Sequence, residues 1–283
     1  MDNQGKRKQV EYVSTPPKTL AYVLIGIGAV WLLVSVIGWS LWPLLLLGIG
    51  LLMLTGYLRP GDVQTHHFSA PLDGAESAEV HLNLEVGETV IQALDDETAL
   101  IDADITHLGD VIFTVTGEQH RVVNLKHAES FALRWVNPAN WFSHYNDLTW
   151  TIGLNPTVPT QLTVSGGAGK ADLNLDGMNL TGVQVKGGVG ETALSLPATK
   201  GAYEVQIQAG VGEFRVHTPE TAAVRLEVRT SVGDVKTSSR LSRISDGHIT
   251  GISGGVWETD SFGRAKHKIT IHFNGGVGAL TVD

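Results

Sequence analysis

The sequence predicts an all-β domain, a β-solenoid built as a single stack with coils of about 22 residues, preceded by an amino-terminal transmembrane hairpin of two α-helices. Three observations predict this class: an uncharged run over residues 20–58, a glycine-centred motif that recurs about every 22 residues, and apolar residues that alternate with polar ones around each motif. The 283 residues include 33 Gly and no Cys. Tight turns should therefore be abundant, whereas disulfide bonds, thiolate catalysis and Cys-ligated zinc are excluded.

Charge separates a short basic tail, residues 1–19, from an acidic domain, residues 59–283. Four basic and two acidic residues give the tail a net charge of +2, so the remaining 16 basic and 27 acidic residues of the chain give the domain a net charge of −11. A domain with this excess of negative charge should not bind nucleic acid through bulk electrostatics.

The uncharged run is too long for one membrane-spanning helix, because at ~1.5 Å per residue it would extend for roughly 58 Å, about twice the hydrocarbon thickness of a bilayer. Two spans, about 20–38 and 42–58, fit instead. Between them, Trp39 and Trp42 should lie at the membrane interface and Pro43 should start the second helix. The lipid bilayer is thus an expected partner.

The orientation follows from the basic residues that flank the run. Lys6, Arg7, Lys8 and Lys18 precede it and Arg59 follows it, so the positive-inside rule places both ends in the cytoplasm of a multi-pass inner-membrane protein. A single Arg after the run leaves an alternative open, in which the chain crosses once and the large domain is extracytoplasmic.

The repeat has glycine at its centre in seven copies and Trp257 in an eighth. Their separations are 22, 60, 21, 22, 21, 24 and 21 residues, and the long interval spans an aromatic-rich insertion at about 121–158. The glycines are predicted to form the corners of the coils: Gly87, Gly109, Gly169, Gly190, Gly212, Gly233 and Gly278.

The apolar alternation shifts by one residue at each corner. The predicted inward residues before Gly212 are Val205, Ile207, Ala209 and Val211, and those after it are Phe214 and Val216. Such a shift would send every later side chain to the wrong face unless the backbone bends there, and glycine permits the bend. Each coil should then stack on the preceding one, ~4.8 Å apart.

Acidic residues follow most of these corners. They would form a column if the coils stack in order, interrupted by Lys170 and Ala279: Glu88, Asp110, Glu191, Glu213, Asp234 and Glu258. Stacked carboxylates could bind Ca²⁺ or Mg²⁺. Exposed corners are well hydrated, however, and the nonapeptide of calcium-binding β-rolls is missing, so no metal or cofactor is predicted.

The insertion is rich in aromatic residues, including Phe131 and Trp150. Two interpretations remain: a cover for the apolar interior, or a surface that binds a glycan, a lipid or a protein. A partner surface would consist of Trp135, Trp141, Phe142 and Tyr145.

Enzyme motifs are missing from the sequence. The eleven His residues show no zincin spacing, and there is no nucleophile elbow or phosphate-binding loop. We therefore predict a protein that is not an enzyme, with a glycan-active β-solenoid enzyme as a remote alternative.

Two blocks of sequence resemble known families. The segment GWSLWPLLLLGIG at 38–50 is similar to the amino-terminal module of bacterial envelope-stress membrane proteins of the LiaF type. The segments WTIGLNP at 150–156, SGGAGKADLNL at 165–175 and GVGETALSLP at 188–197 resemble the toast-rack β-solenoid domains of cell-wall-active antibiotics response proteins and of related proteins classed as putative adhesins.

These resemblances imply a membrane-anchored regulatory or binding protein that takes part in sensing envelope stress. The implied partner is a membrane histidine kinase or a sibling envelope protein. The alternative is a surface adhesin or scaffold, which requires the solenoid to lie outside the cell. The open ends of a solenoid also make self-association an expectation.

Overall fold

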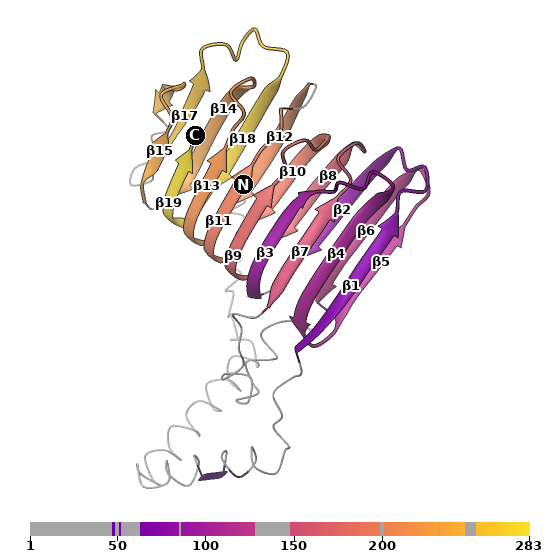
Figure 1. Ribbon diagram of the computed structural model, residues 1–283. Coiled ribbons are helices and arrows are strands. Elements are labelled where there is room, and N and C mark those ends of the chain that lie inside the picture. Colours follow the sequence, from indigo (N-terminus) through magenta and orange to yellow (C-terminus); the bar gives the residue numbers. More distant parts are fainter. Residues whose placement is uncertain are drawn as a thin grey trace, which may run out of the picture. The chain divides into compact units, whose positions relative to one another are not determined.

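The computed structural model describes residues 63–283 except 85, 128–147, 199–200, 232 and 247–252, together with residues 47, 48 and 51. The chain divides into two compact units, residues 1–59 and 60–283. The described residues of the second unit form nineteen strands in two sheets that face each other (Figure 1). The prediction of an all-β solenoid is therefore confirmed for this unit.

Nine strands make up the first sheet, which we call sheet A. In spatial order they are β1 (Val63–Pro71), β4 (Ala99–Leu108), β7 (Thr149–Leu154), β3 (Val86–Ala93), β9 (Ala168–Asn174), β11 (Val189–Ser195), β13 (Val211–His217), β19 (Val277–Val282) and β15 (Val235–Thr237).

Ten strands make up the second sheet, sheet B. In spatial order they are β16 (Leu241–Asp246), β17 (Ser253–Thr259), β14 (Ala223–Ser231), β18 (Lys268–Asn274), β12 (Ala202–Gln208), β10 (Leu180–Lys186), β8 (Thr160–Ser165), β2 (Ser77–Asn83), β6 (His120–His127) and β5 (Val111–Thr116).

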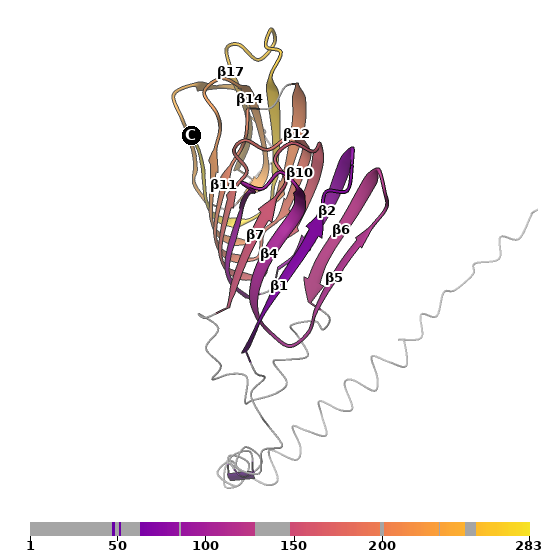
Figure 2. The same cartoon turned by 45° about the vertical axis from the view of Figure 1, so that its right-hand side comes forward.

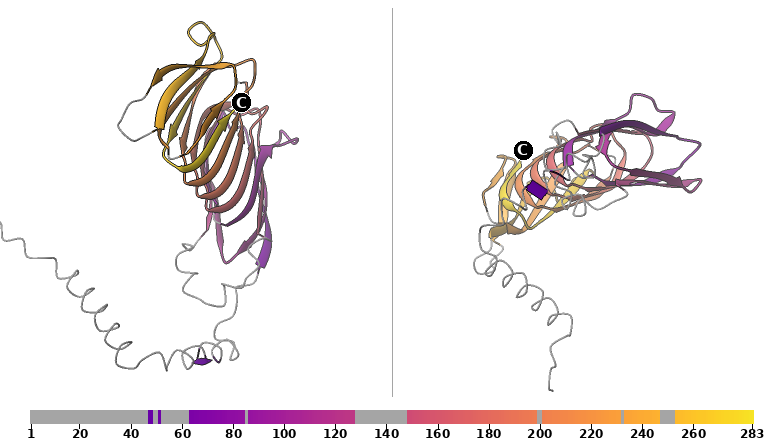
Figure 3. Two further views of the ribbon diagram at one scale, coloured as in Figure 1. Left: turned by 90° about the vertical axis from the view of Figure 1, so that its left-hand side faces the viewer. Right: turned by 90° about the horizontal axis from the view of Figure 1, so that it is seen from below.

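Each regular coil contributes one strand to each sheet. The chain leaves sheet B at the end of β12, turns through Ala209 and Gly210, and enters sheet A as β13. Equivalent strands of neighbouring coils pair in parallel, as in β8, β10 and β12 or β9, β11 and β13. Figure 3 shows these coils as successive layers.

The core lies between the sheets and consists of aliphatic columns that run across the coils. One column in sheet B contains seven residues in register on adjacent strands: Leu226, Ile271, Val205, Val183, Leu162, Val80 and Val123. All seven are buried. At ~1.5–3 kcal/mol for each fully buried aliphatic side chain, this stacking is a major source of stability.

The expectation that coils stack in the order of the sequence holds only for the middle of the stack. Strands β18 and β19 lie between β12–β13 and β14–β15, and the early strands β2 and β3 lie inside the stack, next to β8 and β9. The strand pairs β1–β4, β4–β7, β5–β6, β14–β17 and β16–β17 are antiparallel. Both ends of the stack are therefore built from chain segments that fold back.

The predicted hairpin lies almost entirely outside the described residues. Of its spans at 20–38 and 42–58, only residues 47, 48 and 51 are described, and they are helical. The interface residues Trp39, Trp42 and Pro43 are outside the description. Within the described part of the chain, no helix is both long enough and apolar enough to cross a membrane.

Candidate functional site

A ladder of glycines runs along one corner of the stack. Gly87, Gly169, Gly190, Gly212 and Gly278 lie in register on neighbouring strands of sheet A. Their φ angles lie between 128° and 143°, as does that of Gly233 at 142°. This region of backbone conformation is essentially reserved for glycine.

The ladder also leaves no space for side chains. A Cβ atom on Gly190 would lie 1.9 Å from the carbonyl oxygen of Gly169, and one on Gly212 would lie 1.8 Å from that of Gly190. Because each glycine packs directly on the backbone of the next coil, the corner requires glycine for two independent reasons.

Gly109 departs from this arrangement. It turns the chain from β4 in sheet A to β5 in sheet B with a φ angle of 82°. Its two strands pair antiparallel with their neighbours, so Gly109 is a turn outside the ladder. The prediction that the eighth repeat, centred on Trp257, forms a corner is wrong, because Trp257 lies within strand β17, which pairs antiparallel with β14.

The valines that precede the ladder point outward, contrary to the predicted alternation. Val189, Val211 and Val277 are 60%, 52% and 53% exposed. They lie in register on β11, β13 and β19. Their backbone N–H groups donate to glycine carbonyl oxygens of the neighbouring coil, as Val211 N does to Gly188 O at 2.9 Å. The bend begins before the valine, so its side chain lies on the outside of the corner. We call Val189, Val211 and Val277 the valine row.

The depression beside the valine row is small. It is lined mainly by the glycine-rich corners and encloses about 50 Å³, enough for a few water molecules. Small-molecule sites usually have about 300 Å³ or more. This depression is therefore too small to enclose a typical small-molecule ligand.

The predicted acidic column is only partly present. Glu88, Lys170, Glu191, Glu213 and Ala279 lie in register, so a lysine separates the first two carboxylates. Glu213 also pairs with Arg215 at 3.1 Å.

Two members of that column are elsewhere. Glu258 lies on β17 in sheet B, where its carboxylate accepts a hydrogen bond from Arg225 at 2.7 Å. Asp110 lies in the turn between β4 and β5. Of the described corner positions, Glu191 and Glu213 are therefore the two carboxylates that lie in adjacent register, between Lys170 and Ala279.

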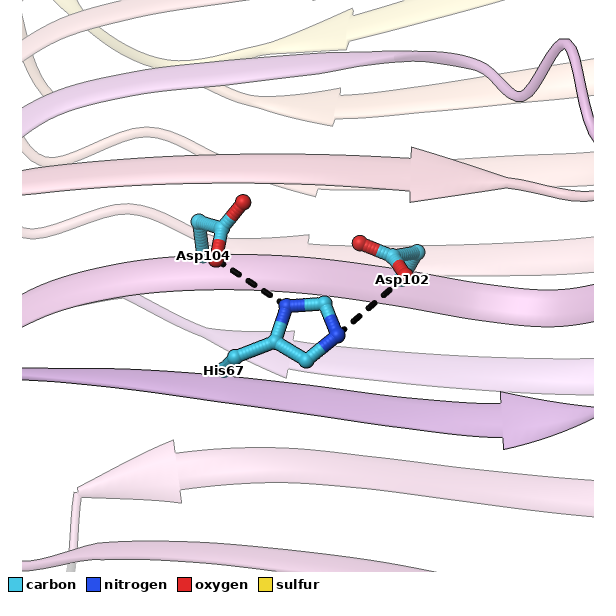
Figure 4. Close-up of side chains that lie close together, drawn as sticks. All are labelled: His67, Asp102 and Asp104. Atoms are coloured by element: carbon cyan, nitrogen blue, oxygen red, sulfur yellow. Dashed lines mark hydrogen bonds and ion pairs between the residues drawn. The ribbon is translucent and has the colours of Figure 1, made fainter.

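A histidine and two aspartates that sequence reasoning did not bring together meet on the outer face of β1 and β4 (Figure 4). His67 Nδ1 lies 3.0 Å from Asp104 Oδ1, and His67 Nε2 lies 3.5 Å from Asp102 Oδ2. One ligand atom from each lies within 4.8 Å of the others, a donor set that could hold a divalent cation.

Exposure weakens this cluster as a binding site. The side chains of His67, Asp102 and Asp104 are 56%, 38% and 65% exposed, so water competes for each ligand atom. The alternation of Asp102 and Asp104 was visible in the sequence, but their nearness to His67 depends on the antiparallel register of β1 with β4.

The aromatic residues predicted as a partner surface, Trp135, Trp141, Phe142 and Tyr145, lie outside the described residues. Trp150, the last aromatic residue of that stretch, is described and fully buried in the core. Its ring lies 5.2 Å from that of His127 in an edge-to-face arrangement. For Trp150, the structural interpretation therefore holds.

One of the solved structures that match the chain shares its fold, with a TM-score above 0.5. A structure titled as a putative cell adhesion protein from Clostridium sporogenes covers 78% of this chain and 99% of its own, with 21% identity and a TM-score of 0.63. Two structures titled as putative adhesins, from Bacteroides fragilis and Parabacteroides distasonis, cover 78% and 80% of this chain and 97% and 99% of their own, with 10% and 9% identity and TM-scores of 0.22 and 0.29.

Comparison by sequence identifies the family. No curated protein matches the chain. The family model for the N-terminal domain of toast_rack, DUF2154, matches residues 59–217, which is more than half of the chain. Together with the stacked coils and their glycine corners, this match shows that the chain belongs to the toast-rack family.

Proposed function

We propose that this protein is a membrane-anchored, non-enzymatic regulatory protein of the cell envelope that binds another protein through the valine row. The observation that carries the proposal is the regular exposure of Val189, Val211 and Val277 on three adjacent strands. The uncharged residues 20–58 support anchoring, and the LiaF-like segment at 38–50 supports a role in envelope-stress sensing.

A protein partner fits the valine row because the row is apolar, rigid and flanked by charge. Glu191 and Glu213 follow two of the valines in the same ladders, so a polar rim borders the apolar centre, as in many protein interfaces. The backbone ladder of the corner fixes the spacing of the row, so little ordering is needed on binding. The proposed partner is a membrane histidine kinase or a sibling envelope protein.

The first test determines on which side of the membrane the domain lies. The chain has no Cys, so Ser239→Cys, at an exposed position, introduces a single thiol for a membrane-impermeant maleimide. Labelling in inverted vesicles but not in intact cells supports a cytoplasmic domain beside a kinase. Labelling in intact cells contradicts this orientation and favours the adhesin alternative.

The second test concerns the valine row. Each membrane histidine kinase of the source bacterium would be co-purified with the wild type and with the triple variant Val189→Ser, Val211→Ser, Val277→Ser. Ile244→Ser is the matched control, because Ile244 is 54% exposed on β16, outside the row. Loss of a kinase with the triple variant alone supports the proposal, and equal recovery with all three proteins contradicts it.

A further inference from the structure

Both sheets end at the same end of the stack in a strand with a single described neighbour. These are β1 in sheet A and β5 in sheet B, which pair antiparallel with β4 and β6. Figure 2 shows both at one end of the two sheets. In an antiparallel edge strand, about half of the N–H and C=O groups point away from the partner strand and are available for pairing.

Neither of these strands carries the charges that usually protect an edge. The nine residues of β1 and the six of β5 contain no Lys, Arg, Asp or Glu. At the opposite end, β15 has only three residues, including Lys236, and β16 contains Arg243 and Asp246. Short and charged edges are the common defences against pairing with another chain. Among the described strands, such a defence is found at the β15 and β16 end and not at the β1 and β5 end.

Among the described residues, the core is also incompletely covered at the β1 and β5 end. Phe68, Val111, Phe113 and Val115 pack against the core but are only partly buried, and the rings of Phe68 and Phe113 lie 5.4 Å apart. At the opposite end, the guanidinium group of Arg243 lies over the Trp257 ring, 5.1 Å from its centroid. Terminal repeats of solenoids need a polar outer face, and the described residues supply none at the β1 and β5 end.

We propose that a second copy of this chain covers this end through antiparallel pairing of β1 with β1 and of β5 with β5. A two-fold axis perpendicular to the sheets keeps each sheet at its own level and reverses the strand direction. It therefore joins both pairs of edges at once. The nine-stranded and ten-stranded sheets would each continue into their copies, and the partly buried phenylalanines would be enclosed.

Head-to-tail stacking is the less favourable arrangement. It would place the nine residues of β1 against the three residues of β15. Every linear assembly of copies built in this way would also keep one unprotected end. The two-fold arrangement closes on itself and leaves only the protected ends exposed.

The test measures the mass of the full chain in detergent by sedimentation equilibrium, corrected for bound detergent. One chain has a mass of 30.3 kDa, and the wild type should have twice that value at about 10 μM, where a dimer with a Kd of about 1 μM or less is mostly assembled. The double variant Thr65→Lys, Thr114→Lys should have the mass of a single chain. Both threonines are exposed, so the lysines do not enter the core, but they put positive charge on both edges that meet in the dimer, where like charges repel.

Two further variants distinguish loss of strand pairing between copies from misfolding of the chain. Ser242→Lys places the same residue at an exposed position of β16, at the protected end, and should remain a dimer. By itself, the variant Thr65→Asp, Thr114→Asp should have the mass of a single chain. An equal mixture of the lysine and aspartate variants should regain the dimer mass, because the two edges that meet then carry opposite charges.

Four results would overturn the proposal: a wild type with the mass of one chain, a lysine variant that stays dimeric, a Ser242→Lys variant that dissociates, or a mixture that stays monomeric. A wild-type mass that rises steadily with concentration would show head-to-tail stacking instead and would equally overturn it.

Discussion

Replacing Gly190 with alanine should destabilise the solenoid much more than replacing Gly177, although both glycines have positive φ angles, 137° and 78°. The two positions differ in the space that is available for a Cβ atom. A Cβ atom on Gly190 would lie 1.9 Å from a backbone oxygen of Gly169, whereas one on Gly177 would meet nothing within 4 Å. Gly182, inside β10, serves as a second control because its nearest contact would be an ordinary 3.9 Å.

The magnitudes follow from these geometries. A non-glycine residue in an unfavourable positive-φ conformation costs roughly 1–3 kcal/mol, which is the full expectation for Gly177→Ala. Gly190→Ala adds the displacement of a backbone that is paired on both sides, about 1–3 kcal/mol more by comparison with overpacked cores. Gly182→Ala should be neutral or stabilise by up to ~1 kcal/mol.

Thermal unfolding of the full chain, followed by circular dichroism, measures the difference. At ~2–4 °C per kcal/mol for a domain of this size, Gly190→Ala should lower Tm by roughly 4–24 °C and always by more than Gly177→Ala. Valine at Gly190 or Gly212 should prevent folding. Equal melting temperatures for Gly190→Ala and Gly177→Ala would refute the argument that close backbone approach makes the corner.

Three other changes test particular interactions. Asn155→Ala should lower the free energy of unfolding, measured in urea, by about 2–4 kcal/mol. The reason is that this buried side chain donates to two backbone carbonyls and accepts three hydrogen bonds. A loss below about 1 kcal/mol would contradict this prediction. Leu194→Ala should cost about 2–5 kcal/mol, and the exposed Val189→Ala close to nothing; equal losses would contradict the assignment of inner and outer positions. Burial, and secondarily the charge of Asp176, raises the pKa of Tyr203, whose hydroxyl donates to Pro197 O. The folded state thus holds this proton more tightly than the unfolded chain, in which tyrosine titrates near pH 10. The free energy of unfolding should therefore decline as the pH rises above about 10. Tyr203→Phe should weaken that decline, and an unchanged pH profile in this variant would contradict the assigned role of Tyr203.

The sequence predicted the regular part of the solenoid well because its signals are local. Val205, Ile207, Phe214 and Val216 were expected inside from their alternation, and all four are buried. Each coil repeats the same pattern of core and corner residues, so the period is visible without knowledge of the partner strands.

The exceptions arise where side-chain direction or proximity depends on the bend or on the topology. Val211 follows the apolar alternation but is exposed, because the chain already turns at Ala209 and Gly210. Gly109 has the local sequence of a corner but joins strands that run antiparallel to their neighbours. His67 meets Asp102 and Asp104 only through the register of β1 with β4, which no sequence period reveals.

The position of β18 and β19 inside the stack has a consequence for synthesis on the ribosome. These strands contain residues 268–282, yet they pair with β12 and β13 on one side and with β14 and β15 on the other. When β14 and β15 leave the exit tunnel, the neighbours that connect them to the earlier coils have not yet been made. Growth of the stack by one coil at a time must therefore stop after β13, and the rest can be completed only after β18 and β19 have been synthesised.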